Sequence, residues 1–515
     1  MPETFNFPQK FKEFSQGGYF KTTVLFVFLL ELLSLFGYLL PSFNTAAFFT
    51  ILLLVLFLTL EKLEYGVYII LAELFIGSKG YLFFFDFAGI SISIRLGIFL
   101  IVMSAFIYHA LKDRKIVFLK SKLFYYYLAF FAFLLLGVVL GILHNIGFDN
   151  LFFDFNGYLY FALAPVFFAV LNDYEKIKNT LQIFAACLFT TFIKASIILF
   201  IFSHKMDYIM IYLYRWIRTT GIGEITSING DFYRIFFQAQ VYTVIGFFIF
   251  FSIIAFKEKI STKDLTNLRY GGFLAAMLSG ILISFSRSFW FGIIFTALAA
   301  LILLIFKYKS GVKNIIKIFL FCIALLAISI GFIFAVVKFP FPQASSSFSL
   351  NMMQDRLKAI SGEAGVSSRW NLLPELNKGI MKHLLFGSGF GSTITYKSED
   401  PRILETNPSG MYTTYAFEWG YLDTIYKIGI LGLLAYLILI WKIFQAGYIA
   451  IKNQTKQNIR NLLLGMILGL IVLLITHVFS PYLNHPLGIG YIIICACIFE
   501  YFAKEASIDK SKITA

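Results

Sequence analysis

Long, uninterrupted runs of apolar residues dominate the pattern of hydrophobic and polar positions along this chain. The runs are about 17 to 25 residues long, which is the length that an α-helix needs to cross roughly 30 Å of hydrocarbon. They stay apolar throughout, whereas the strands of a membrane β-barrel would alternate apolar and polar residues. The pattern therefore predicts an all-α, polytopic integral membrane protein with about 12–14 transmembrane helices and one large extracytoplasmic loop. The predicted spans lie near residues 22–40, 43–60, 65–77 (followed by a short apolar piece at 80–90), 91–110, 122–143, 150–171, 179–203, 233–256, 270–286, 289–306, 315–337, 424–441, 461–480 and 486–502.

Two long hydrophilic segments interrupt these runs and divide the chain into four parts. The first apolar run has no small-residue cleavage site after it, so we expect a retained span rather than a signal peptide. The expected parts are N-terminal transmembrane helices (1–203), core helices with an outer loop at 204–232 (204–337), an extracytoplasmic loop (338–423), and C-terminal transmembrane helices with a short cytoplasmic tail (424–515).

Lys and Arg residues cluster in four short loops, at 111–122, 257–269, 307–317 and 442–460. Short loops with this bias stay in the cytoplasm, whereas long segments cross the membrane largely regardless of their charge. The alternation of spans puts all four loops on the same side. We therefore predict a protein of the cytoplasmic (inner) membrane, with both termini inside and its active site facing the periplasm or the cell exterior.

The composition narrows the classes of function. The 515 residues are 59% hydrophobic and only 14% charged, whereas a soluble protein is roughly a quarter charged. The net charge of +15 suits contact with anionic lipid or an anionic substrate. Nucleic acid is a poor partner, because the positive charges lie in short loops between spans. The four Cys residues fall in apolar runs at spacings that predict neither disulfides nor a zinc site, and no motif for a metal or an organic cofactor is present.

One arginine, Arg287 in "LISFSRSFWFG", interrupts a long apolar stretch, and the predicted spans place it at the outer end of a helical hairpin. A charge in the bilayer centre would cost a few kcal/mol or more, so a rim position is expected. Guanidinium groups bind diphosphates through two parallel hydrogen bonds. Single interface arginines can instead snorkel to lipid headgroups, but several on one face favour a diphosphate site. The other predicted outward arginines are Arg215, Arg218, Arg234 and Arg369.

Charged residues that lie within or beside predicted spans include Glu31, Glu73, Asp86, Asp154 and Lys194. For Glu31 and Glu73 we expect structural ion pairs between helices, whereas Lys194 lies far enough outward in its span to reach an outer site.

The segment "SSRWNLLPELNKGIMKHLLFGSGFGS" predicts a surface helix on the outer loop. Ser368 is the expected N-cap, and Pro374 should shorten or kink the helix. The glycine-rich end could cradle a phosphate, but no helix follows it directly. We expect it to cap the helix and reverse the chain.

The hairpin "LISFSRSFWFG" resembles the serine-arginine-serine hairpin of the O-antigen ligase and O-antigen polymerase superfamily. The segments "RTTGIGEITSINGDFYRIFFQAQ", "YLDTIYKIGILGLLAYLIL" and "LLITHVFSPYLNHPLGIG" are similar to that family in order and spacing, over roughly residues 210–500. The resemblance implies a metal-independent, inverting glycosyltransferase. Such an enzyme moves a glycan from polyprenyl (undecaprenyl) diphosphate to a sugar hydroxyl outside the cytoplasmic membrane. It also implies that Arg215 or Arg218, together with Arg287, holds the diphosphate, and we add Arg369 from its position on the outer face.

Ligases of that family carry a histidine just before the "YLD" helix, but here "FEWGYLD" places Glu418 at that position. A carboxylate can also accept the proton of an attacking hydroxyl, so Glu418 is the first candidate base. His477 and His383 are the second candidates, although a structural role as a hydrogen-bonded histidine at the membrane interface is favoured for His477. The substitution favours a polymerase over a ligase.

The expected function is therefore a polymerase of surface polysaccharide, such as O-antigen, capsule or exopolysaccharide. A ligase that transfers finished glycan to a lipid or protein acceptor is the nearest alternative. A flippase of lipid-linked oligosaccharide is the alternative from another class, and it should show inverted repeats and charges across the membrane. The expected partners are a polyprenyl-diphosphate-linked oligosaccharide, a glycan or lipid acceptor and the lipid bilayer, and a chain-length regulator is a further candidate.

Overall fold

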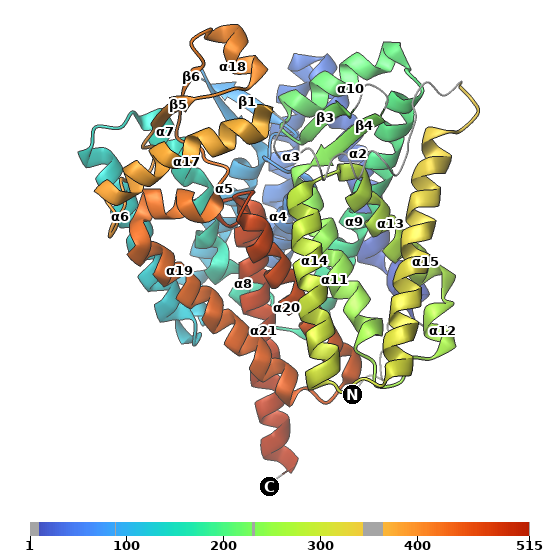
Figure 1. The fold of residues 1–515 in the computed structure, drawn as a ribbon. Coiled ribbons are helices and arrows are strands. Elements are labelled where there is room, and N and C mark those ends of the chain that lie inside the picture. Colours follow the sequence, from blue (N-terminus) through green and yellow to red (C-terminus); the bar gives the residue numbers. More distant parts are fainter. Residues whose placement is uncertain (1–9, 88, 229–231, 343–363, 514–515) are drawn as a thin grey trace.

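The computed structural model describes residues 10–87, 89–228, 232–342 and 364–513, which form a bundle of helices (Figure 1). In these ranges, twelve helical segments are long and apolar enough to cross a membrane. The prediction of an all-α, polytopic membrane protein is confirmed. The spans are formed by α2 (Gly18–Leu39), α3 (Pro41–Glu61), α5 (Ile94–Asp113), α6 (Phe124–Leu143), α7 (Phe148–Phe155) continued by η2 (Asn156–Leu163) and α8 (Ala164–Val170), α9 (Tyr174–Ser203), α11 (Val241–Ala255), α14 (Arg287–Ile302), α15 (Val312–Val337), α19 (Gly420–Asn453), α20 (Gln457–His477) and α21 (Pro486–Ile513). The shorter apolar helix α13 (Leu268–Ser284) and the 14-residue helix α4 (Leu63–Ile76) pack among them.

The two long hydrophilic segments lie at the same end of the bundle (Figure 1). The first contains α10 (Asp207–Thr219) and strand β3 (Gly223–Ile228). The second contains α17 (Ala364–Lys382), α18 (Pro401–Thr406) and the hairpin of β5 (Ile394–Lys397) and β6 (Met411–Thr414). We call this the loop end. The C-terminal end of α21 and the short helix α12 (Thr262–Leu265) lie at the opposite end, as the predicted arrangement requires.

Two predicted spans are partly strands. The apolar piece at 80–90 contributes to a hairpin of β1 (Phe84–Phe87) and β2 (Ile90–Ser93). The predicted span 233–256 begins with β4 (Phe232–Phe237), which pairs with β3 so that Thr226 faces Arg234, and its helix starts only at Val241. The sequence of β4, "FYRIFF", is rich in aromatic side chains that favour strands, but a short apolar run cannot be assigned by periodicity alone.

The predicted start of the surface helix was also wrong. α17 begins at Ala364, so Ser368 lies inside the helix rather than capping it. The Ser368 hydroxyl instead contacts the Ser398 hydroxyl at 3.0 Å and accepts the N–H of Glu399 at 2.9 Å. Pro374 does not end the helix, which continues to Lys382.

The glycine turn after α17 fits into a break in α19. α19 is interrupted at Gly429 (φ 73°, ψ 175°), and there the N–H of Ile430 donates to Leu384 O at 2.8 Å. On the other side of the break, the N–H groups of Ser388 and Gly389 donate to Tyr426 O and Lys427 O at 2.7 and 3.1 Å. Backbone groups that the break would leave unpaired are thus satisfied by the turn. Strand β5, which follows the turn, packs back against α17, so the prediction that the turn reverses the chain is confirmed.

The break gives a direct test of this packing. Gly429→Ala should destabilise the protein, because its backbone lies in a region that costs other residues about 1–3 kcal/mol and an added Cβ would lie 2.2 Å from Leu385 O. Thermal unfolding in detergent, followed by size-exclusion chromatography, measures the effect. Gly331→Ala on α15 is the matched control, since a Cβ there meets nothing within 4 Å. Equal melting temperatures for the two variants would contradict the account of the break.

Candidate active site

The hairpin between α13 and α14 presents Arg287 at the loop end. Phe285 adopts a left-handed conformation (φ 45°) that ends α13. The Ser284 hydroxyl donates to Ile281 O at 2.6 Å and accepts the N–H of Ser286 at 3.3 Å. These contacts turn the chain so that Arg287 becomes the first residue of α14, where it is partly buried at the rim.

Arg234 lies directly beside this hairpin. Its Nε donates to Ser284 O, the carbonyl near the end of α13, at 2.8 Å, and its guanidinium lies 4.7 Å from the Phe236 ring centroid. Phe232 on the same strand contacts Phe285 at 5.0 Å between ring centroids. A guanidinium bound to the last carbonyls of a helix is favourable for that helix. Strand β4 thus brings a second arginine to the rim that carries Arg287.

The turn after α20 closes the same rim. Ser480 contacts the Ser288 hydroxyl at 3.1 Å, and Tyr482 donates to Gln238 O at 3.2 Å. His477 lies beneath this turn, only 1% exposed, and its Nδ1 accepts the N–H of Leu483 at 3.1 Å. The side chain of His477 therefore holds the turn from below.

Arg369 and Glu418 come together from α17 and from the residues before α19. Their side chains form an ion pair and are 39% and 55% exposed. Trp419 fixes this arrangement, because its Nε1 donates to Arg369 O at 3.1 Å. The Trp419 ring contacts Phe479 at 5.6 Å, and Phe479 contacts Phe291 of α14 at 5.4 Å. Two ring contacts thus connect the Arg369–Glu418 pair to the helix that begins with Arg287.

The remaining predicted site residues lie further out. Arg215 and Arg218 are exposed on α10, and Arg218 pairs with Glu224 at 3.2 Å. Within the described parts of the chain, neither of them forms a hydrogen bond or ion pair with the Arg287 hairpin. His383 is exposed at the far end of α17, where its ring lies 5.6 Å from that of His144. The structure therefore groups Arg287 with Arg234, and Glu418 with Arg369.

Residues 272–437 match the family model described as O-antigen ligase. This segment is therefore similar to the O-antigen ligase family. This match supports the O-antigen ligase and polymerase superfamily, as the resemblance predicted, and it indicates a membrane enzyme of that type. A comparison with curated proteins found no match. The matched segment includes the Arg287 hairpin, α17 and the residues around Glu418, whereas Arg234 lies before it.

Two basic positions outside the matched segment were not among the predicted site residues. Lys79 follows α4 and is exposed, and its side chain lies against Gly221, whose φ of +62° favours glycine. His485 follows the α20 turn; its pKa is lowered, because the ring is desolvated and the cations of Arg95 and Lys79 are near. Both are therefore close to one another at the loop end. The loop "GSKG" was the available signal for Lys79, but nothing in the sequence linked it to His485.

The charges inside the spans form structural pairs. Glu73 accepts from Arg95 at 2.7 Å, and Glu31 lies 2.5 Å from Lys194. The expectation of ion pairs for Glu31 and Glu73 is confirmed. Lys194 is 6% exposed and donates to Glu31 within the bundle. The expectation that Lys194 reaches the outer site was therefore wrong, because its ammonium group is paired inside the bundle. In the described ranges, no group of three or more His, Cys, Asp or Glu side chains is placed to hold a metal ion.

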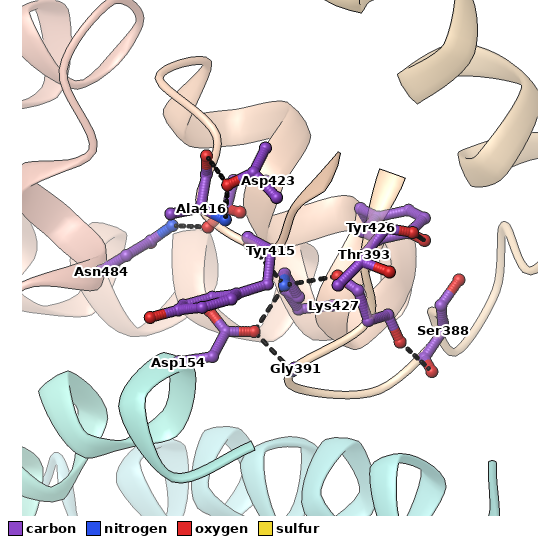
Figure 2. A network of polar contacts seen from close by, with 12 residues as sticks. Asp154, Ser388, Gly391, Thr393, Tyr415, Ala416, Asp423, Tyr426, Lys427 and Asn484 are labelled. Atoms are coloured by element: carbon purple, nitrogen blue, oxygen red, sulfur yellow. Dashed lines mark hydrogen bonds and ion pairs between the residues drawn. The ribbon is translucent and has the colours of Figure 1, made fainter. Parts of the chain in front are cut away.

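A buried lysine connects the segment that matches the family model to a span that precedes it in the chain (Figure 2). Lys427 on α19 is 1% exposed, and its ammonium lies 2.5 Å from Asp154 on α7. It also donates to Tyr415 O at 2.7 Å and to Ser392 O at 3.1 Å. Asp154 accepts the N–H of Gly391 at 2.6 Å as well. The two charges therefore fix both the glycine turn and the segment that leads to Glu418.

A second polar contact extends this network to the turn after α20. Asn484 donates to the Asp423 carboxylate at 2.7 Å and accepts the Thr424 hydroxyl at 3.0 Å (Figure 2). Asp423 and Thr424 lie in the first turn of α19, and Asn484 lies in the turn that also carries Ser480. The start of α19 and this turn are thus held in one position relative to one another.

Removing the lysine charge should show how much the fold depends on it. Lys427→Met leaves the Asp154 carboxylate buried without its cation, which costs about 3–5 kcal/mol. The double variant Asp154→Asn/Lys427→Met should recover part of that loss, because the buried charge is gone. Lys178→Met is the control, since this exposed lysine pairs with Glu175 and should contribute at most about 0.5 kcal/mol. Thermal unfolding in detergent distinguishes them, and a Lys427→Met variant as stable as Lys178→Met would contradict the account.

Proposed function

We propose that the chain is a membrane glycosyltransferase that polymerises a surface polysaccharide, transferring glycan from a polyprenyl diphosphate to a sugar hydroxyl. The match to the O-antigen ligase family supports the general class of enzyme. The observation that carries the proposal is the rim at the loop end, where Arg234 and Arg287 lie on one side of an aromatic contact and the Arg369–Glu418 pair lies on the other. We propose that this end faces the periplasm or the cell exterior.

Arg287 is proposed to hold the diphosphate. The leaving group gains negative charge as the bond between the anomeric carbon and the phosphate oxygen breaks. A fixed guanidinium in a poorly solvated site stabilises that charge without rearranging as the reaction proceeds. Arg234 is proposed to share this role, because its Nε donates to Ser284 O at 2.8 Å beside the same hairpin. Arg215 and Arg218, exposed on α10, are proposed to attract the diphosphate toward the rim.

Glu418 is proposed to act as the base. The acceptor hydroxyl oxygen attacks the anomeric carbon from the face opposite the diphosphate and inverts its configuration, while its proton passes to the Glu418 carboxylate. The electron pair of the broken bond leaves with the diphosphate. Arg369 favours the charged carboxylate that this step needs, so its proposed role moves from the diphosphate to Glu418. We assign His477 to support of the turn, because it is buried and its Nδ1 is occupied by Leu483.

A polymerase is favoured over a ligase because Glu418 stands where the resemblance predicts a ligase histidine. The test uses purified protein with a synthetic polyprenyl-diphosphate oligosaccharide and separates the products by size. A ladder of lengthening glycans supports a polymerase, and a single transfer to an added lipid acceptor would identify a ligase. Movement of the intact substrate across a vesicle without any transfer would overturn the proposal in favour of a flippase.

The role of Arg287 can be tested by a change that keeps its charge. Arg287→Lys loses the planar fork that binds a diphosphate, so transfer should fall by roughly 100-fold or more. Arg287→Ala should be no better. The control is Arg269→Lys, because Arg269 is exposed at the start of α13, at the other end of that helix. Rates are compared at matched amounts of folded protein. Near-normal transfer by Arg287→Lys would contradict the proposal that the planar guanidinium group of Arg287 binds the diphosphate.

The proton acceptor can be tested by an isosteric change. Glu418→Gln keeps the size of the side chain but cannot accept the proton, so transfer should fall by about 10²–10⁴-fold. Glu399→Gln, an exposed carboxylate of the same outer segment, should leave the rate unchanged. Both rates are measured with the same lipid-linked substrate. A Glu418→Gln enzyme that works at the normal rate would exclude Glu418 as the base.

A further inference from the structure

One cavity of the protein lies away from the arginine rim. It has a volume of about 900 Å³ and opens at the loop end, between the end of α6, the C-terminal half of α17 and the turn that leads into β5. A volume of this size falls in the range of small-molecule and cofactor sites. None of the roles proposed above uses it.

The lining of the cavity is rich in groups that bind sugar hydroxyls. Asn377 and Glu375 reach it from α17, and Thr393 and Thr395 reach it from the turn and from β5. Together these side chains offer amide, carboxylate and hydroxyl groups that donate or accept hydrogen bonds. Tyr426 adds an aromatic surface to the wall. We propose that this cavity binds an oligosaccharide, as a subsite for sugar units distant from the bond that is formed. The inference rests on the proposed glycosyl transfer.

Helix α17 connects this cavity to the proposed base. Arg369, near the first turns of α17, pairs with Glu418, whereas the cavity lies along the later turns of the same helix. One side of α17 is formed by residues at spacings of three and four, namely Trp370, Pro374, Asn377 and Met381. From Trp370 to Met381 this side extends about 16 Å, at 1.5 Å per residue. A glycan that leaves Glu418 along α17 would therefore reach the cavity.

Trp370 offers an exposed aromatic surface between the Arg369–Glu418 pair and the cavity. Its side chain is 55% exposed, and its ring is held against Trp419 at 5.4 Å between centroids with the planes at 68°. An exposed indole that is fixed in this way offers an apolar face and costs little conformational entropy to use. Its position beside the Arg369–Glu418 pair suits the sugar ring next to the reacting one.

The walls of the cavity are set before any ligand binds. His144 Nδ1 donates to Ser388 O at 2.9 Å, which fixes the orientation of the imidazole ring. The Tyr426 hydroxyl donates to Thr393 O at 3.2 Å, and Ser392 O accepts from the buried Lys427. A site that is ordered in advance loses less entropy when it binds. The same network that positions the segment before Glu418 thus also positions the cavity.

The test compares a variant that fills the cavity with one that does not. Asn377→Trp places a large ring at an exposed lining position, and Asn371→Trp makes the same change on the same helix at an exposed residue that does not line the cavity. The probes are oligosaccharides of one, two and three repeat units, released by mild acid from the lipid-linked pool of the producing cells. In one arm the released oligosaccharides serve as acceptors with a fixed lipid-linked donor. In the other arm, oligosaccharides of one, two and three repeat units that are still linked to polyprenyl diphosphate serve as donors with a fixed acceptor.

We expect wild-type transfer to gain at least about tenfold in kcat/KM from the shortest to the longest glycan in one arm. The arm that shows this gain identifies whether sugars of the donor or of the acceptor occupy the cavity. Asn377→Trp should lose this gain and keep the rate for the shortest glycan, while Asn371→Trp should behave as wild type. The same gain in Asn377→Trp and wild type, or no gain in wild type, would overturn the subsite and leave the proposed transfer intact.

Direct binding separates failure of the subsite from failure of the transfer reaction. Calorimetric titration with the released three-unit glycan should show binding to wild type and Asn371→Trp and none to Asn377→Trp. Cavity-dependent binding in a protein that transfers nothing would support the subsite and overturn the proposed function. Equal binding in all three proteins would show that the glycan binds outside the cavity, and this result would overturn the subsite. Displacement of the glycan by vesicles of phosphatidylglycerol would overturn it as well, because it would identify the cavity as a lipid site.

Discussion

Lys427 places a charged ammonium group in the interior of the protein, where an ion loses several kcal/mol of solvation unless it is paired. Asp154, Tyr415 O and Ser392 O supply its partners, and they come from three separate parts of the chain. This requirement holds α7, the glycine turn and the segment before α19 in a single arrangement. The break at Gly429 makes this arrangement possible, because the glycine turn bonds to backbone groups of α19 that an uninterrupted helix would pair internally.

This constraint also explains how an irregular segment can support a reaction. The residues between β6 and α19 lack regular structure of their own, yet Glu418 lies among them. Their position is fixed by Lys427 from below and by the contact of Trp419 with Arg369 O from the side. A carboxylate that must meet a bound sugar needs such support, because an error of about 1 Å can reduce catalysis roughly 100-fold. The arginine rim, by contrast, rests on the end of α13 and on the β3–β4 hairpin.

The sequence predicted the membrane spans, the ion pairs of Glu31 and Glu73, and the rim position of Arg287, because each follows from local hydrophobicity and the cost of burying a charge. It could not predict that Arg234 lies beside Arg287, since that depends on the pairing of β4 with β3 within an apolar run. Nor could it join Lys427 to Asp154, which lie in different parts of the chain. The separation of Arg369 from the other arginines has the same origin, because only the folded loop brings Arg369 to Glu418.

The central claim is that the arginine rim at the loop end binds the diphosphate of the lipid-linked substrate. The most direct test is an electron cryomicroscopy structure of the purified protein with a polyprenyl diphosphate in a lipid nanodisc. The account predicts diphosphate density within hydrogen-bonding distance of the Arg287 guanidinium, on the same rim as Glu418. Density that instead occupies the cavity of about 530 Å³ lined by Phe20, Phe192 and Arg269, with none at Arg287, would contradict it.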